Sequence, residues 1–383
     1  MIPPSAPPPK KSQIRVADLV IVAVIAFLLA AMLWNVQSNM TSAGIRPGFG
    51  FLNQGAGFDL SEALVAYEPS DSYASAILAG VLNTLFLSVV CLVLSTLIGV
   101  VFGLISVGPS PIGRLLAHGY VEVFRNLPKL LVLLVLYVLA VNGLPQVRDA
   151  FSIGPFHLSN RAFNVPVLVW DVRMWIPVFI LCGGVVCWRL WRRRASDNRA
   201  AIAQQGTGLI FIATLALAVL SIFVLDVPVA ISVPELKGFD FRGGVRFSMQ
   251  FAVIALTLGI YHGAQIAEVV RGGLSAIPKG QPEAALSLGM SRWQTTCLIT
   301  LPQVIRIVIP PMSNQYVNLI KNTSISIAVG YSDLMSVSGT IINQTFRPLE
   351  MMIVTMGVYL SICVFVTTLL NEFHRRLTAR EER

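Results

Sequence analysis

Long uncharged stretches alternate with short polar segments along this chain. A transmembrane helix needs about 20 mostly apolar residues. Ser72–Gly113 contains no charged residue. The pattern predicts eight membrane spans, in chain order within Leu19–Ile45, near Leu78–Val107, Leu115–Val141 and Trp175–Trp191, within Ala200–Leu225, and near Phe251–Val270, Val317–Tyr331 and Met351–Leu370. The chain is therefore predicted to be an all-α polytopic membrane protein.

Composition agrees with this assignment and excludes several other classes of protein. Of the 383 residues, 55% are hydrophobic and only 12% are charged, and the mean hydropathy is +0.72. A soluble domain carries about 25% charged residues. The net charge of +9 fits basic cytoplasmic loops better than nucleic-acid binding. The five cysteines form no metal-ligand cluster and no disulfide framework, so neither a metal nor a cofactor is expected.

The distribution of Lys and Arg residues predicts the orientation. Eight spans place both termini on one side of the membrane. With that side in the cytoplasm, 17 of the 28 Lys and Arg residues lie in cytoplasmic segments and span ends, and 8 lie outside. This bias follows the positive-inside rule. The longest outside segments are too short for a sizeable folded domain, so a soluble receptor would be a separate chain.

A polar loop after the sixth span is predicted to form a short helix with a defined start and end. Pro282 suits the first helical position, and Glu283 places negative charge where the helix dipole favours it. Ala284 and Ala285 are strong helix formers, and Gly289 can adopt the left-handed conformation that ends a helix. Such a helix on the cytoplasmic surface is suited to docking into a cleft of another protein.

The residues after this loop predict further short helices. Ser291 and Gln294 fit a capping box, which predicts a second helix reaching Leu301. Pro302 is expected to start another segment, and Pro310 with its neighbour Pro311 is expected to bend it.

Two pairs of opposite charge lie near the cytoplasmic ends of predicted spans. Glu122 and Arg125 are three residues apart in the third span, and Glu268 and Arg271 have the same spacing in the sixth. Ionisable groups in a span are costly and normally face partners or water. Either the two pairs meet and brace a gate above the polar loop, or each pair is satisfied within its own helix.

The seventh span is the best candidate to line a polar path. Asn314, Asn318 and Asn322 are spaced by four residues and share one helix face. Lys321 and Ser324 add polarity beside them. Hydrogen bonding between helices is the alternative role of this stripe. A lone intramembrane histidine, His262 in the sixth span, is interpreted as a packed and hydrogen-bonded residue.

Taken together, these motifs resemble the permease subunits of bacterial ATP-binding-cassette (ABC) importers, in the polar amino-acid branch. The family signature is Glu-Ala-Ala, three residues, Gly, and then a variable stretch to Leu-Pro. In this chain it reads Glu283-Ala284-Ala285, Gly289 and Leu301-Pro302. The flanks 267–273 and 318–324, and Asn83-Thr84-Leu85, match as well. The resemblance covers roughly residues 80–370, and the extra spans resemble those of general L-amino-acid permease subunits.

The segment after the third-span proline departs from the family pattern. Family members usually have apolar residues after this proline and then a glutamine. Here Lys129 directly follows Pro128 in place of an apolar residue. Val132 stands in the following run in place of the glutamine.

The resemblance implies a type I ABC importer transmembrane domain in the bacterial inner membrane, with both termini cytoplasmic and lipid around the spans. A periplasmic binding protein would deliver an L-amino acid, and two permease subunits would form the path; the resemblance to the longer subunits favours a second subunit of different sequence. Two ATPase subunits would each grip a coupling helix formed by Glu283, Ala284, Ala285 and Gly289. The implied parts are a cytoplasmic tail (1–15), an extra span with a periplasmic segment (16–78), the transmembrane domain (79–372, with inserted spans at about 175–225 and the coupling loop at 280–301), and a cytoplasmic tail (373–383).

An ion-coupled secondary transporter of a small polar solute is the alternative function. Such proteins tend to show inverted repeats, and none is evident in this sequence. A membrane enzyme is disfavoured because the spans contain no His or Cys cluster and no paired carboxylates. The chain also lacks the phosphate-cradling Gly-x-x-x-x-Gly-Lys-Ser/Thr motif, so ATP hydrolysis is expected in a partner.

Overall fold

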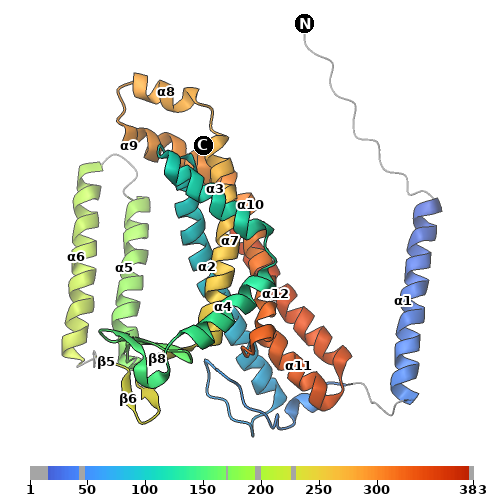
Figure 1. Ribbon diagram of the computed structural model, residues 1–383. Helices are drawn as coiled ribbons and strands as arrows, with labels where there is room; N and C mark the ends of the chain where they lie inside the picture. Colours follow the sequence, from blue (N-terminus) through green and yellow to red (C-terminus); the bar gives the residue numbers. More distant parts are fainter. Residues whose placement is uncertain (1–15, 43–47, 170, 195–199, 226–229, 379–383) are drawn as a thin grey trace.

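The computed structural model describes residues 16–42, 48–169, 171–194, 200–225 and 230–378 (Figure 1). The predicted tail 1–15 lies outside the described residues, as does the end of the second tail at 379–383. The short helix α8 lies at one end of the helical assembly and the β-strands lie at the opposite end. These two ends are called the α8 end and the sheet end below.

Helices dominate the described residues and confirm the predicted fold class. The α-helices are α1 (Val16–Ser42), α2 (Tyr73–Val107), α3 (Pro111–Asn126), α4 (Lys129–Gly143), α5 (Trp175–Arg194), α6 (Ala200–Val224), α7 (Met249–Ser275), α8 (Gly280–Ser287), α9 (Arg292–Gln294), α10 (Leu301–Asn322), α11 (Leu334–Thr345) and α12 (Pro348–Thr378). The π-helical segment η4 (Thr295–Thr300) joins α9 to α10, and the 3₁₀ segment η5 (Thr323–Val329) follows α10. Short 3₁₀ turns are η1 (Gly50–Asn53), η2 (Val147–Asp149) and η3 (Val172–Met174).

The candidate spans follow the predicted order. By length and composition, five helical segments of the described chain could cross a membrane, or six if α3 and α4 together count as one. Two further apolar helices are shorter, Trp175–Arg189 in α5 and Ile210–Ser221 in α6. These segments correspond to the eight predicted spans. Helix α1 stands apart from the others (Figure 1), and almost all of its described side chains are exposed.

The predicted third span is not one straight helix. Helices α3 and α4 meet at an angle of 103° across Leu127 and Pro128. Leu127 is extended, with φ −79° and ψ 141°. A proline disfavours helical geometry in the residue before it and has no amide hydrogen to donate. The bend places Lys129 at the first residue of α4 rather than in the middle of a span.

Pro302 starts a helix as expected, because α10 begins at Leu301, but α10 continues the helical run that comes before it. Residues Arg292–Val329 form an unbroken helical run, so the seventh span begins much earlier than predicted. Pro302 lies in the first turn of α10, where its missing amide hydrogen costs little. Pro310 and Pro311 lie inside α10. Prolines are tolerated in membrane helices where neighbouring helices and side chains satisfy the freed backbone groups.

Short strands on both sides of the α5–α6 hairpin pair with each other, which the sequence did not predict. A four-stranded antiparallel sheet has the order β1 (Phe151–Ile153), β2 (Phe156–Leu158), β3 (Ala162–Val165) and β8 (Val245–Ser248). Two smaller pairs are β4 (Val167–Leu168) with β5 (Ile231–Ser232), and β6 (Glu235–Lys237) with β7 (Asp240–Arg242). The β3–β8 pairing runs from Ala162 opposite Ser248 to Val165 opposite Val245. It therefore brings together the start and end of the segment that carries α5 and α6.

Helices α2 and α7 pack closely because both present small residues. Gly99 and Gly103 on α2, and Gly259 and Gly263 on α7, each have the Gly-x-x-x-Gly spacing that lets helix backbones approach in a membrane. A Cβ atom added at Gly99 would lie 2.5 Å from Cγ2 of Ile266. Side chains larger than hydrogen at this contact would force the two helices apart.

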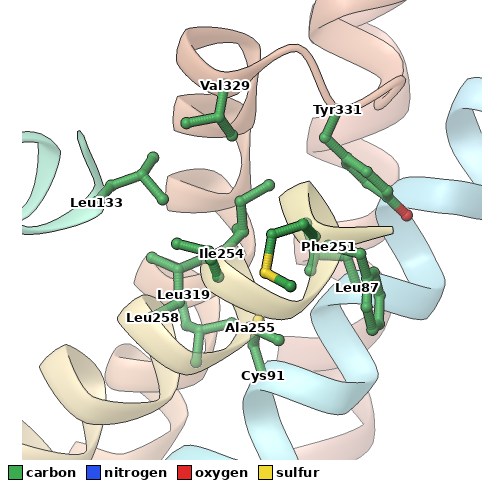
Figure 2. Close-up of a cluster of buried hydrophobic side chains, with 12 residues drawn as sticks. Leu87, Cys91, Leu133, Phe251, Ile254, Ala255, Leu258, Leu319, Val329 and Tyr331 are labelled. Carbon is green, nitrogen blue, oxygen red and sulfur yellow. The ribbon is translucent and has the colours of Figure 1, made fainter. Parts of the chain in front are cut away.

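The main buried cluster fixes α4 and η5 against this central pair. Leu87 of α2, Leu133 of α4, Ile254 of α7 and Leu319 of α10 are fully buried, and Val329 of η5 joins them (Figure 2). The core thus sets the relative positions of the elements that carry the predicted path residues.

The substitution Gly99→Ala is expected to destabilise the α2–α7 contact. Overpacking a tight core typically costs about 1–3 kcal/mol. Gly119→Ala on α3 is the matched control, because a Cβ atom there meets nothing within 4 Å. Thermal unfolding of the two purified variants in detergent measures their stability. Equal stability of the two variants would show that the α2–α7 contact is looser than its geometry indicates.

Candidate functional site

Helix α8 ends as the sequence predicts. Gly289 has φ +82°, and a Cβ atom there would meet nothing within 4 Å. Its amide donates to the carbonyl of Leu286 at 3.0 Å, and the amide of Met290 donates to the carbonyl of Ala285 at 3.2 Å. These two bonds are the Schellman arrangement, in which a left-handed glycine closes the helix. The conformation, rather than lack of space, therefore selects glycine at position 289.

The start of α8 differs from the prediction by two residues. The helix begins at Gly280, so Pro282 is its third residue and not its first. The amide of Gln281 donates to Pro278 and the amide of Glu283 to Lys279, so the chain already turns before the proline. The first amides of a helix have no intrahelical partner, which is why Pro282 is tolerated. Glu283 lies in the first turn as predicted.

The surface around α8 exposes apolar side chains. Leu288 is 83% exposed and Trp293 is 76% exposed, with Leu286 also exposed nearby. Ala285 is buried against the rest of the chain. Apolar side chains clustered on an exposed surface are typical of protein contacts.

Helix α8 is joined to α10 through a well-ordered connection. The predicted capping box is present: Ser291 Oγ accepts from the Gln294 amide, and Gln294 Oε1 accepts from the Ser291 amide. It starts α9, which continues through η4 into α10. Helix α8 also packs against η4, so it contacts the helical run that contains α10.

The two predicted charge pairs lie towards the α8 end. Arg271 pairs with Glu268 one turn away, with Nε–Oε2 2.9 Å and Nη2–Oε1 2.5 Å. Glu122 accepts from Asn126, also within one helix. The charge of Arg125 acts on Glu268 from α3. In the described chain no ion pair joins Glu122 to Arg271, so the α7 pair has the geometry of the within-helix alternative.

Charge exchange distinguishes pairing within each helix from pairing between α3 and α7. Exchanging the charges within α7, by Glu268→Arg with Arg271→Glu, is expected to restore stability that each single change lowers by under about 1 kcal/mol. Exchange across the helices, by Glu122→Arg with Arg271→Glu, is expected to restore nothing. Thermal stability and uptake measure the rescue. Rescue by the second exchange would contradict the within-helix arrangement.

The predicted polar stripe on α10 is exposed along most of its length and partly buried at its end. Asn314, Asn318 and Lys321 are exposed, whereas Asn322 is partly buried. Ser324 donates to the backbone carbonyl of Lys321 at 2.9 Å. Asn314 and Asn318 form no hydrogen bond to another helix within the described chain, and their side chains are exposed.

Asn322 is instead the centre of a side-chain cluster that was not predicted from the sequence. Lys129 Nζ donates to Asn322 Oδ1, and Asn322 Nδ2 lies 3.2 Å from His262 Nε2. Lys129 Nζ also lies 6.0 Å from the centroid of the Tyr261 ring. Among the described residues, no acidic side chain forms an ion pair with Lys129. The cluster therefore presents a cation that has polar partners but no counter-ion.

Its members come from three separate elements, α4, α7 and α10. The departure of Lys129 from the family pattern was the available sequence signal, but it did not indicate a partner. His262 is hydrogen-bonded and buried, as interpreted from the sequence. No group of three or more His, Cys, Asp or Glu residues in the described ranges could hold a metal ion.

Comparison with known proteins identifies the family. The family described as binding-protein-dependent transport system inner membrane component matches residues 95–379. The chain is 35% identical over 380 residues to the General L-amino acid transport system permease protein AapQ of Rhizobium johnstonii, covering 97% of this chain and 94% of that protein.

A second relative is the glutamate/glutamine/aspartate/asparagine transport system permease protein BztB of Rhodobacter capsulatus. It is 29% identical over 396 residues, covering 94% of this chain and 93% of that protein. A crystal structure of an amino acid ABC transporter with histidines has a TM-score of 0.47 and 19% identity, covering 79% of this chain and 95% of that one. The extent of the family match and the identity to AapQ show that this chain belongs to the inner-membrane permease components of binding-protein-dependent ABC transport systems.

Proposed function

We propose that this permease subunit carries L-amino acids across a bacterial inner membrane as part of an ATP-driven importer. The names of AapQ, from a general L-amino acid transport system, and of BztB, from a glutamate/glutamine/aspartate/asparagine transport system, support this substrate class. In this proposal, separate ABC ATPase subunits hydrolyse ATP and a periplasmic amino-acid-binding protein delivers the substrate. A second permease subunit of different sequence completes the path.

One observation carries the mechanism: the unbroken helical run from Arg292 to Val329. Its beginning packs against α8, and Leu288, directly after α8, and Trp293 are both exposed. Its far half carries the asparagine stripe and Asn322. We infer that an ATPase subunit grips α8 through Glu283, Ala284, Ala285 and Gly289, and that α10 transmits this movement to the path.

The proposed path runs along the stripe Asn314, Asn318, Lys321, Asn322 and Ser324 and passes Lys129. The α8 end is cytoplasmic, as are both termini, and the sheet end is periplasmic. This topology places 17 of the 28 Lys and Arg residues on or near the cytoplasmic side. Residues 79–372 form the transmembrane domain, the α5–α6 hairpin is an insertion within it, and α1 is an additional span in contact with lipid.

Reconstitution tests the proposal. The permease complex in liposomes, with its ATPase and binding-protein partners, is expected to accumulate labelled L-amino acid only with ATP. The ATPase is expected to co-purify with the wild-type permease and to be lost when Leu288 and Trp293 are both changed to Glu. Uptake by the purified chain alone under an ion gradient would contradict the proposal and favour a secondary transporter.

A further inference from the structure

A polar cavity of about 460 Å³ opens at the sheet end, away from the coupling helix. It is lined by Glu62 from the segment before α2, by Arg161 and Arg246 from the strand region, and by Tyr137 of α4 and Gln250 of α7. Four parts of the chain thus meet around one cavity that is lined by both acidic and basic side chains.

These opposite charges form no ion pair with each other in the described chain, although the positive charge of Arg246 acts on Glu62. The Glu62 carboxylate accepts a hydrogen bond from the Ser248 hydroxyl at 2.5 Å and forms no ion pair in the part of the chain that is described. Arg246 is paired with Asp240 at 3.1 Å, outside the cavity lining. Arg161 has no ion-pair partner among the described residues. Burial raises the pKa of the Glu62 carboxyl, because the charged form loses water.

The backbone that carries these groups is held in place. Asn83 Nδ2 donates to the backbone carbonyl of Glu62 at 2.7 Å, which ties this segment to α2. The amide of Met249 donates to the backbone carbonyl of Arg161 at 3.0 Å, which ties the strand region to the start of α7. Charged groups fixed before a ligand arrives lose little freedom on binding.

An unused acceptor also lines the cavity. The Oδ1 atom of Asn160 is buried and has no hydrogen-bond partner. A buried polar atom without a partner costs free energy unless a ligand or water satisfies it. Together with Glu62, it provides acceptors for a cationic group, while Arg161 in the same cavity provides donors for an anionic group.

We propose that this cavity binds the zwitterionic α-amino-acid group of the transported solute, with Glu62 and Asn160 facing the ammonium and Arg161 facing the carboxylate. The proposal rests on the function proposed above and adds to it a first binding site for the solute. The cavity lies at the sheet ends of α4 and α7, the same helices that carry Lys129 and His262 towards the α8 end. Tyr137 is about 12 Å along α4 from Lys129, at 1.5 Å per residue. A solute released at the sheet end would reach this cavity before the Lys129 cluster.

Equilibrium binding to the purified permease–ATPase complex tests this site. The three probes are L-glutamine, the same molecule without its α-amino group, and the same molecule without its α-carboxylate. Glu62→Gln is expected to weaken L-glutamine binding by about tenfold or more and to leave the deaminated acid unaffected, because charge-assisted hydrogen bonds are the strong ones. Arg161→Gln is expected to weaken L-glutamine similarly and to leave the decarboxylated amine unaffected.

Lys237→Gln is the matched control. This exposed lysine lies at the same end, pairs with Glu235 at 3.1 Å and does not line the cavity, so its substitution is expected to leave binding unchanged. Native affinity in both cavity variants, equal losses for all three probes, or no binding to the wild-type complex would overturn the site. ATP-driven uptake by the wild-type complex is measured separately, so failure of the site remains distinguishable from failure of the proposed function.

Discussion

Gly289→Val is expected to bring ATP-driven uptake close to background while the permease still reaches the membrane. Position 289 has φ +82°, a conformation that is a genuine outlier for a β-branched residue. For L-residues the left-handed conformation costs roughly 1–2 kcal/mol, so the Schellman turn that closes α8 would open. The surface that we propose for the ATPase would then lose its shape. Gly289→Asp is expected to act in the same direction, because a negative charge is unfavourable at a helix C-terminus.

Two neighbouring substitutions separate conformation from bulk. Gly280→Ala adds a Cβ atom where nothing lies within 4 Å and where φ is not positive, so normal uptake is expected. Gly289→Asn is expected to retain part of the activity, because asparagine tolerates the left-handed conformation better than valine does. Uptake and co-purification of the ATPase are measured for each variant against equal amounts in the membrane. Normal uptake by Gly289→Val would rule out a coupling role for the end of α8.

Local features of α8 and of the turn after it were predictable, because each depends on residues only a few positions apart. The left-handed Gly289 and the capping box of Ser291 with Gln294 depend on hydrogen bonds that span three to five positions. The number and order of the spans follow from hydropathy alone. Even here, Pro282 is two positions later in the helix than predicted, because the turn begins with bonds to Pro278 and Lys279.

Features that depend on distant contacts were not predictable in this way. Pro128 breaks a span whereas Pro310 lies inside a helix, so the presence of a proline did not by itself predict where a span bends. The β3–β8 pairing joins residues that the α5–α6 hairpin separates along the chain. Lys129, His262 and Asn322 appear in three different segments, and only the packing of α4 and α10 against α7 brings them together.

Lys129→Met, in the cluster of Lys129, His262 and Asn322, is expected to lower amino-acid uptake by about tenfold or more. A charge-assisted hydrogen bond contributes about 1.5–3 kcal/mol, and 1.4 kcal/mol corresponds to a factor of ten. Lys129 has an amide oxygen and an aromatic face nearby but no described acidic partner. A cation within a membrane protein normally faces a partner or a water-filled path. Its ammonium is therefore available to attract the carboxylate of a passing amino acid.

Asn322→Asp distinguishes this attraction from a packing role. The substitution keeps the shape of the side chain but places a permanent counter-ion beside Lys129, whose Nζ already donates to position 322. Uptake is expected to fall as it does for Lys129→Met, because the ammonium is then neutralised within the protein. Lys129→Arg keeps the charge and is expected to retain more uptake than Lys129→Met does. Similar losses for Lys129→Arg and Lys129→Met, with normal uptake by Asn322→Asp, would mean that Lys129 supports packing and does not act on the solute.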